Sequence, residues 1–242
     1  MLVRRALPSM FTVGNLFLGI ISIIVAFQGN FDWAALLVII GMLLDGLDGR
    51  VARMLNAQSE FGKELDSLSD VISFGVAPAF IMYGVVLNEM GWIGAVITAV
   101  FPICGALRLA RFNVATGSPN YFIGLPITAA GGVLATLALY HSLLPAPNIT
   151  LPLFMVFLAY LMVSNIKYPN FKKVGIPKSA YYIVPLILLI VLTTFMFWPQ
   201  YVNRLIFLPL ACYALYGVLK KNGKKKSRKT EVVEDPYETI AK

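Results

Sequence analysis

The sequence predicts an all-α protein, a polytopic bundle of about eight membrane-spanning helices. Hydrophobic residues fill 58% of the 242 positions and charged residues only 13%, whereas a soluble domain carries roughly a quarter charged residues. Apolar runs recur along the chain at lengths near the ~20 residues that a ~30 Å hydrocarbon core requires. These runs are unbroken, and the weak alternation of barrel strands is absent from them, which argues against a transmembrane barrel.

Breaks at glycine, proline, asparagine and charged residues separate eight apolar segments. The first follows Arg4 and Arg5, as a secretory signal would, but no small-x-small cleavage pattern appears near residues 28–30, so we interpret it as a span. The second and third carry more ionisable residues than a lipid-facing helix tolerates, and the other five are interpreted as further spans. The segments are 12–28, 32–55, 62–88, 92–114, 122–141, 149–166, 179–197 and 201–219.

The chain divides into a membrane domain, residues 1–219, and a tail, residues 220–242. Residues 220–229 are strongly basic and directly follow the last predicted span, so we interpret them as a topology anchor that can also bind anionic lipid headgroups. Residues 231–242 alternate in charge and contain few apolar side chains. That composition is typical of disorder.

Basic residues predict the orientation, because lysine and arginine collect at the cytoplasmic ends of membrane helices. In the eight-span arrangement both termini share one side, and every Lys and Arg of the 20 except Arg204 falls on that side. We therefore expect an integral protein of the cell membrane with both termini in the cytoplasm. The net charge of +8 follows from this topology and the tail, so it does not indicate nucleic-acid binding.

Residues 45–70 carry the groups suited to catalysis. At 100° per residue, neighbours in a helix spaced three and four apart share a face, and this spacing places four carboxylates on two consecutive helices, where they can converge at the cytoplasmic end. The first stripe holds Asp45, Asp48, Gly49 and Ala52 with Arg53 beside it, and the second holds Gly62, Asp66 and Asp70.

Four bare carboxylates would repel one another in a partly desolvated pocket. Protonation would neutralise one or two of them, whereas divalent cations would neutralise all four, and Mg²⁺, Mn²⁺ and Ca²⁺ prefer oxygen ligands. A metal pair held by carboxylates can clamp a phosphate or pyrophosphate during in-line displacement. The small residues leave room for a bulky ligand against the helices, and Arg53 offers a planar donor fork to phosphate. The alternative is an ion-transport or proton-relay group.

The acidic pattern resembles the signature of the CDP-alcohol phosphotransferases. It reads Asp45-x-x-Asp48-Gly49-x-x-Ala52-Arg53, eight residues, Gly62-x-x-x-Asp66-x-x-x-Asp70, with every specified position filled. The resemblance implies a membrane enzyme, a homodimer, that holds two divalent cations and in which an alcohol attacks a lipid-linked cytidine diphosphate and releases CMP.

The same resemblance implies a role for each residue of the signature. Asp45, Asp48 and Asp66 would be metal ligands, and Asp70 would border the metal site and act as general base on the acceptor hydroxyl. Three small residues would lie against the cytidine, with Arg53 near phosphate; they are Gly49, Ala52 and Gly62.

Further motifs resemble the phosphatidylserine synthase branch of that family. They are SLSDVISFGVAP at 67–78, CGALRLARFN at 104–113, FIGLP at 122–126 and SNIKYP at 164–169. The branch implies that CDP-diacylglycerol, or an ether-lipid equivalent, donates a phosphatidyl group to L-serine. Glycerol phosphate or inositol phosphate is the alternative acceptor, and a cation transporter is the alternative from another class.

Both substrates of that reaction carry negative charge that needs a cation. Arg108 and Arg111 lie three apart near the predicted cytoplasmic boundary, and Lys167 follows the sixth segment. We expect these three side chains to contact the serine carboxylate or the pyrophosphate. Ser73, Asn113 and Asn165 could orient the acceptor, and Asn15, near the start of the first segment, could be either a substrate contact or an interfacial cap.

Overall fold

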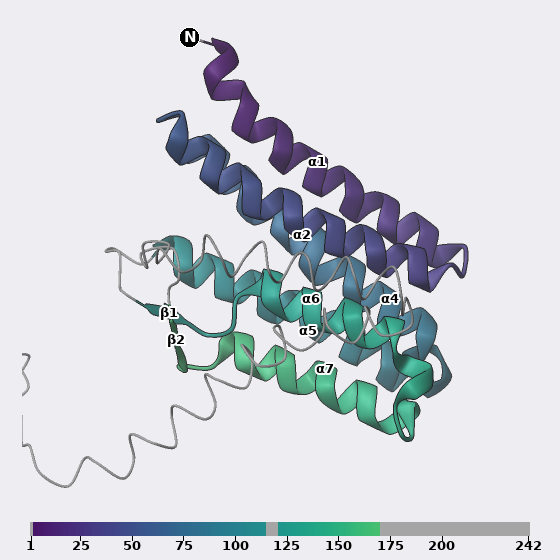
Figure 1. The fold of residues 1–242 in the computed structure, drawn as a ribbon. Coiled ribbons are helices and arrows are strands. Elements are labelled where there is room, and N and C mark those ends of the chain that lie inside the picture. The colour runs from purple at the N-terminus through teal and green to yellow at the C-terminus, as the bar shows by residue number, and fades with distance from the viewer. Residues whose placement is uncertain (1, 115–120, 170–242) are drawn as a thin grey trace, which may run out of the picture.

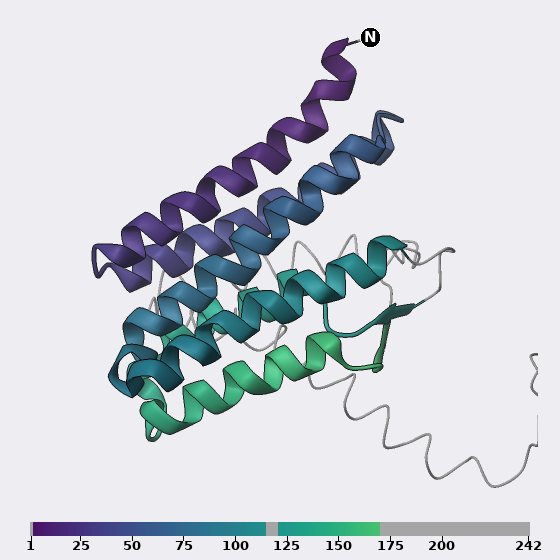
Figure 2. The ribbon, with the colours of Figure 1, turned by 180° about the vertical axis from the view of Figure 1, so that it is seen from behind.

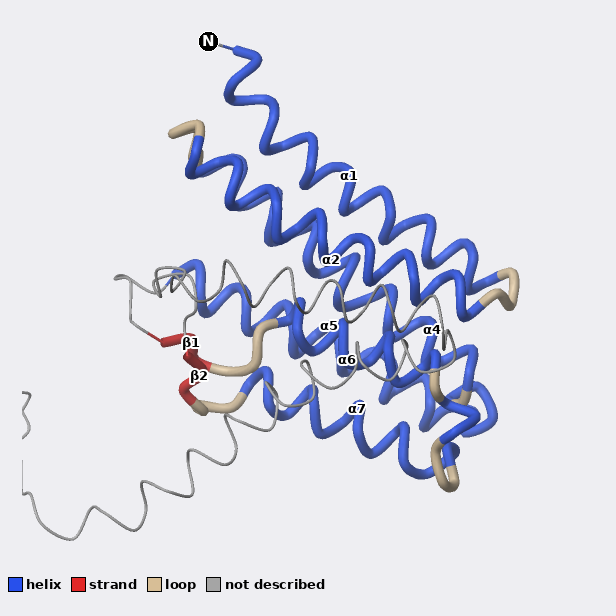
Figure 3. Tube along the Cα trace, viewed as in Figure 1, coloured by secondary structure: helices blue, strands red, loops and turns tan. Residues whose placement is uncertain are grey.

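The computed structural model describes residues 2–114 and 121–169, and these are almost entirely helical (Figures 1 and 3). The α-helices are α1 (Leu2–Phe27), α2 (Phe31–Met54), α3 (Glu60–Asp70), α4 (Ala77–Val85), α5 (Gly91–Val114), α6 (Ile127–Leu139) and α7 (Pro147–Val163). A π-helical turn, Val71–Val76, joins α3 to α4, and short 3₁₀ turns lie at Leu87–Met90 and His141–Leu143. The predicted all-α class is confirmed.

Each predicted segment within the described residues contains a helix, but two predicted starts are wrong. The first helix begins at Leu2 and not at residue 12, since Pro8 lies inside the helix without ending it. The fifth begins at Ile127 and not at residue 122, because residues 121–123 form a strand and Gly124 has a φ of 78°. The predicted spans 179–197 and 201–219 and the tail 220–242 lie outside the described residues.

Among the described residues, three helical stretches are long and apolar enough to cross a membrane, as expected of a membrane protein. They are Pro8–Phe27, Glu60–Val85 and Leu87–Val114. α6 and α7 are apolar but shorter, and α2 carries the acidic and basic side chains of the predicted site. The count of eight crossings stays a prediction.

Helices α1 and α2 form a long antiparallel pair, and the continuous stretch from α3 to α4 runs back along them (Figures 1 and 2). One end of the bundle therefore collects the start of α1, the connection from α2 to α3 and the end of α5 (Figure 2). The connections at residues 28–30, 86–90 and 140–146 lie at the other end. The acidic residues of α2 and α3 belong to the first end.

α6 forms the core of the described bundle, since eleven of the twelve positions from Ile127 to Ala138 are buried. Its alanines and glycines allow neighbouring helices to approach closely, as small residues do in membrane bundles. A Cβ atom added to Gly131 would lie 2.8 Å from the Cα of Phe74 in the π-helical turn. A Cβ at Gly19 of α1 would lie 2.8 Å from the Cα of Ser73 in the same turn. The π-helical turn is thus closely packed against both α1 and α6.

A small antiparallel pair of strands lies at the same end as the acidic residues. Strand β1 (Tyr121–Ile123) pairs with β2 (Lys167–Pro169), with Phe122 opposite Tyr168. The backbone N–H of Gly124 donates to the carbonyl of Ile166 at 2.8 Å. This pairing joins the segment before α6 to the segment after α7.

Candidate active site

Three carboxylates from two helices meet at one end of the bundle. Asp45 and Asp48 lie one turn apart on α2, Asp66 lies on α3, and one oxygen of each falls within 4.8 Å of the others. Ligands on opposite sides of one Mg²⁺ or Ca²⁺ ion are roughly 4–5 Å apart, because metal–oxygen bonds are about 2.0–2.6 Å long. The spacing therefore suits a shared divalent cation, and the oxygen-only donor set suits a hard one.

Asp70 borders this cluster at the end of α3, one helical turn beyond Asp66. Its side chain is buried, and its Oδ1 has no hydrogen-bond partner among the described residues. A buried polar atom without a partner is costly, so a cation or a substrate hydroxyl would supply what this oxygen lacks. The charged groups within its electrostatic range are Asp45, Asp48, Asp66 and Arg108.

The short connection from α2 to α3 brings the two acidic stripes together. Asn56 has a φ of 49°, a left-handed conformation in which asparagine is enriched. Ser59 then caps α3, because its hydroxyl accepts a hydrogen bond from the backbone N–H of Gly62 at 3.0 Å. The chain folds back within a few residues, so Asp48 near the end of α2 faces Asp66 in α3.

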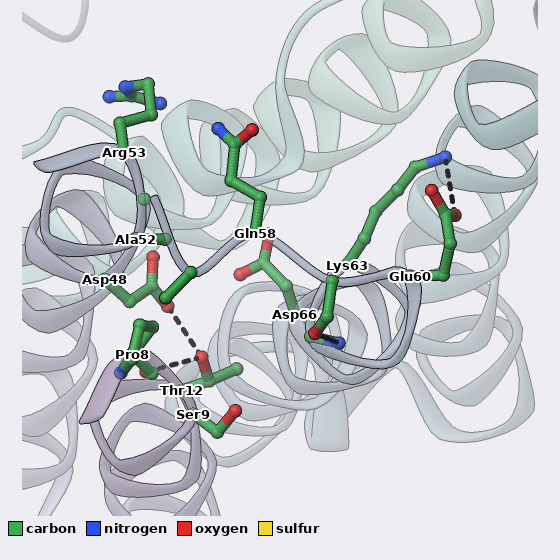
Figure 4. A pocket seen from close by; sticks show the side chains of 14 residues that line it. Pro8, Ser9, Thr12, Asp48, Ala52, Arg53, Gln58, Glu60, Lys63 and Asp66 are labelled. Atoms are coloured by element: carbon green, nitrogen blue, oxygen red, sulfur yellow. Dashed lines mark hydrogen bonds and ion pairs between the residues drawn. The ribbon is translucent and has the colours of Figure 1, made fainter. Parts of the chain in front are cut away.

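A cavity of about 530 Å³ opens beside the cluster (Figure 4). It lies between the start of α1, the end of α2 and the first turns of α3, and the carboxylates of Asp48 and Asp66 face it from two sides. The small residues of the predicted signature, Gly49, Ala52 and Gly62, line it as well. The remaining lining residues are Pro8, Ser9, Thr12, Arg53, Ala57, Gln58, Ser59, Glu60 and Lys63. The cavity therefore combines acidic groups with free space along the helix backbones.

The contribution of Thr12 was not predicted from the sequence, which pointed only to Asn15 in α1. The hydroxyl of Thr12 donates to Oδ2 of Asp48 at 2.9 Å (Figure 4), and Pro8 and Ser9 line the cavity one turn earlier. A threonine near the end of an apolar helix carries no charge pattern, and the sequence alone does not tell which face of α1 meets α2. The only available signal was a hydroxyl close to the predicted boundary of the span.

Two of the predicted basic contacts differ in burial. Arg53 is exposed at the end of α2, and Figure 4 shows its guanidinium extending away from the carboxylate of Asp48. Arg108 is buried, with its guanidinium carbon 5.7 Å from the ring centroid of Phe112, and it is the positive group within electrostatic range of Asp70. Of the two, Arg108 is the one close to the predicted base.

Arg111 makes its contacts at the end of α7. Its guanidinium donates to three oxygens at 3.2, 3.4 and 3.2 Å, which are the carbonyls of Val163 and Ser164 and the Oδ1 of Asn165. It thereby joins α5 to the segment that leads into β2. Lys167 lies in β2, and its side chain is outside the described part of the chain. A substrate contact by either residue stays a prediction.

The polar residues expected to orient the acceptor join helices to one another. The side-chain amide of Asn113 donates to the hydroxyl of Ser67 at 3.0 Å and to Oε2 of Glu64 at 3.5 Å, which connects α5 to α3. The hydroxyl of Ser73 donates to the backbone carbonyl of Asn15 at 3.0 Å. These contacts therefore connect α3, which carries Asp66 and Asp70, to α5, and the π-helical turn after α3 to α1.

Comparison with known families settles the classification. The sequence profile of the CDP-alcohol phosphatidyltransferases matches residues 5–216, which is most of the chain. The chain belongs to the CDP-alcohol phosphatidyltransferase family. The acidic cluster and the cavity both lie inside the matched region, and the resemblance inferred from the acidic pattern is confirmed.

Curated members of the family include relatives in bacteria and archaea. A Helicobacter pylori protein, CDP-diacylglycerol–serine O-phosphatidyltransferase, is 49% identical over 173 residues, which cover 69% of this chain and 73% of the relative. A Bacillus subtilis protein of the same name is 41% identical over 167 residues, covering 69% and 92%. The archaetidylserine synthase of Methanothermobacter thermautotrophicus is 38% identical over 174 residues, covering 70% and 72%.

Removal of one clustered carboxylate should weaken cation binding. We expect Asp66→Ala to weaken Mn²⁺ binding at least tenfold, because a lost ligand leaves the cation with fewer negative oxygens. Electron paramagnetic resonance of Mn²⁺ titrated into the purified protein measures this directly. Asp32→Ala is the matched control, since Asp32 lies in the first turn of α2 at the other end of the helix. Unchanged Mn²⁺ affinity in Asp66→Ala would remove Asp66 from the ligand set.

Proposed function

We propose that this protein transfers a phosphatidyl group from CDP-diacylglycerol, or an ether-lipid equivalent, to L-serine, and releases CMP. The observation that carries the proposal is the cluster of Asp45, Asp48 and Asp66 beside an open cavity, in a chain whose relatives are named as serine phosphatidyltransferases and an archaetidylserine synthase. The negative charge of a pyrophosphate would complement the divalent cations that these carboxylates can hold.

Two divalent cations, Mg²⁺ or Mn²⁺, would be held by Asp45, Asp48, Asp66 and Asp70, and Ca²⁺ could occupy the same oxygens. When bound, they would neutralise the pyrophosphate and stabilise the charge that develops on the departing CMP oxygen. The orphaned Oδ1 of Asp70 and the spacing of the other three carboxylates support this ligand set.

The donor would occupy the cavity with its cytidine against Gly49, Ala52 and Gly62. Each of these lines the cavity, and each lacks the side-chain bulk that would exclude a flat base. Arg53 at the rim would contact phosphate through its guanidinium fork. The lipid tails would stay in the bilayer beside the apolar outer faces of the helices.

Asp70 would act as the general base. It would take the proton from the serine hydroxyl while the hydroxyl oxygen attacks the phosphorus nearest the lipid, and the bond from that phosphorus to the CMP oxygen would break. Arg108, buried and within electrostatic range of Asp70, would pair with the serine carboxylate. Arg111 and Lys167 would add positive charge toward the pyrophosphate from the segments at the ends of α5 and α7.

The active site and both termini would face the cytoplasm, and the enzyme would act as a homodimer in the cell membrane. Supporting the orientation, the described basic residues gather at the end of the bundle that carries the cavity, as the positive-inside rule requires. Those with described side chains are Arg50 and Arg53 near the end of α2, Lys63 in the first turns of α3, and Arg108 and Arg111 near the end of α5. The membrane domain would extend to residue 219, followed by the basic tail 220–242.

Acceptor choice can be tested by release of CMP from CDP-diacylglycerol in detergent micelles with Mg²⁺ or Mn²⁺. We expect release that depends on L-serine and is abolished by EDTA, because the site needs both an acceptor hydroxyl and cations. Glycerol 3-phosphate and inositol phosphate are the matched alternative acceptors, each assayed in place of serine. Release with one of these alone would assign a different acceptor, and absence of release with acyl and ether donors, together with metal flux in proteoliposomes, would indicate a transporter.

Asp70→Asn tests whether Asp70 acts as the general base in addition to holding a cation. We expect the turnover number to fall about 10²–10⁴-fold, the usual contribution of general-base catalysis, while donor binding is reduced less than turnover. Rates of CMP release and binding of CDP-diacylglycerol are measured on the same preparation. Near-full turnover in Asp70→Asn would exclude Asp70 as the base.

A further inference from the structure

Thr12 of α1 is the residue through which the first helix contacts a carboxylate of the cluster. Its side chain is 4% exposed, and its hydroxyl oxygen lies 2.9 Å from Oδ2 of Asp48 and 3.2 Å from the carbonyl of Pro8 (Figure 4). A hydroxyl has one proton to donate. The carboxylate is the closer and the charged acceptor, so it takes the stronger hydrogen bond.

This hydrogen bond restricts Asp48. The terminal torsion of an aspartate is broad, so a carboxylate without a donor can rotate and present either oxygen to the cluster. With Oδ2 held by Thr12, the carboxylate of Asp48 keeps one orientation relative to Asp45 and Asp66, whose oxygens lie within 4.8 Å of it. Donors of this kind around metal ligands fix the orientation of the ligand.

The backbone of Thr12 contacts the other acidic helix. Its carbonyl accepts a hydrogen bond from the hydroxyl of Ser69 at 3.2 Å, and Ser69 is buried immediately before Asp70. One residue of α1 therefore contacts both elements that supply carboxylates, Asp48 through its side chain and the end of α3 through its carbonyl.

We propose that Thr12 is a positioning residue for the divalent-cation site, which holds Asp48 in the orientation that binds the cation. The proposal rests on the proposed function in one respect, the assignment of Asp48 as a cation ligand. It adds a residue of α1 to a site otherwise built from α2 and α3. The role belongs to the hydroxyl, so a residue that keeps the hydroxyl should keep the function.

The test compares Thr12→Val, which has the shape of threonine without the hydroxyl, with Thr12→Ser, which keeps it. Mn²⁺ is titrated into the purified full-length protein in detergent, with no lipid or acceptor substrate, and free Mn²⁺ is followed by electron paramagnetic resonance. We expect Thr12→Val to weaken Mn²⁺ binding about 10–100-fold, the usual effect of losing such a donor. Thr12→Ser should stay within about threefold of the unmodified protein.

Thr136→Val is the matched control. Thr136 is also buried, but among the described residues its hydroxyl donates to the carbonyl of Gly132 in its own helix, at 2.6 Å. We expect its Mn²⁺ affinity to be unchanged. If Thr12→Val does not fold, as judged by thermal unfolding without metal, Thr12→Ala replaces it, since it also lacks the hydroxyl and introduces no additional methyl group.

Three results would overturn the proposal. The first is unchanged Mn²⁺ affinity in the variants that lack the hydroxyl. A loss of CDP-diacylglycerol binding in those variants, with Mn²⁺ affinity unchanged, would also overturn the proposal and would indicate that Thr12 contacts the lipid substrate. An equal loss in Thr12→Ser is the second, and an unmodified protein that binds no Mn²⁺ is the third. The Mn²⁺ titration contains no substrate, so its result does not depend on the CMP-release assay. If the unmodified protein binds Mn²⁺ but releases no CMP in that assay, the proposed function is overturned and the role of Thr12 stands.

Discussion

Mutual repulsion among Asp45, Asp48 and Asp66 is the constraint that shapes this end of the bundle. Three carboxylate oxygens lie within 4.8 Å of one another, and two like charges at that distance repel by about 3 kcal/mol at an effective dielectric constant of about 20. The fold brings them together through a short connection between α2 and α3. The hydroxyl of Thr12 donates to one of these carboxylates, Asp48, and a bound divalent cation would neutralise all three.

Packing around the π-helical turn helps to set the position of Asp70 beside the three carboxylates. Gly19 of α1 and Gly131 of α6 approach Ser73 and Phe74 so closely that neither glycine has room for a side chain. Since Asp70 immediately precedes this turn, its position depends on how α3 and α4 are held. π-helical turns are frequently found at functional sites, and here the turn connects the end of the acidic stripe to the membrane-embedded part of the helix.

The sequence predicted the acidic stripes and the small residues beside them, because helical spacing converts directly into a shared face. It did not predict Thr12, whose role depends on which face of α1 meets α2, nor the strands that join residues 121–123 to 167–169. Pairing between segments so far apart leaves no local pattern in either. Likewise, spacing placed Arg108 and Arg111 together, and only tertiary packing separates them, one near Asp70 and the other at the end of α7.

We propose that the carboxylates of α2 and α3 form a divalent-cation site, and the proposed chemistry depends on it. Crystals of the protein soaked in Mn²⁺ and measured at an X-ray energy above the manganese absorption edge test it most directly. We expect anomalous peaks about 2.0–2.6 Å from carboxylate oxygens of Asp45, Asp48 and Asp66. Anomalous peaks that lie only elsewhere, or none at saturating Mn²⁺, would contradict the claim.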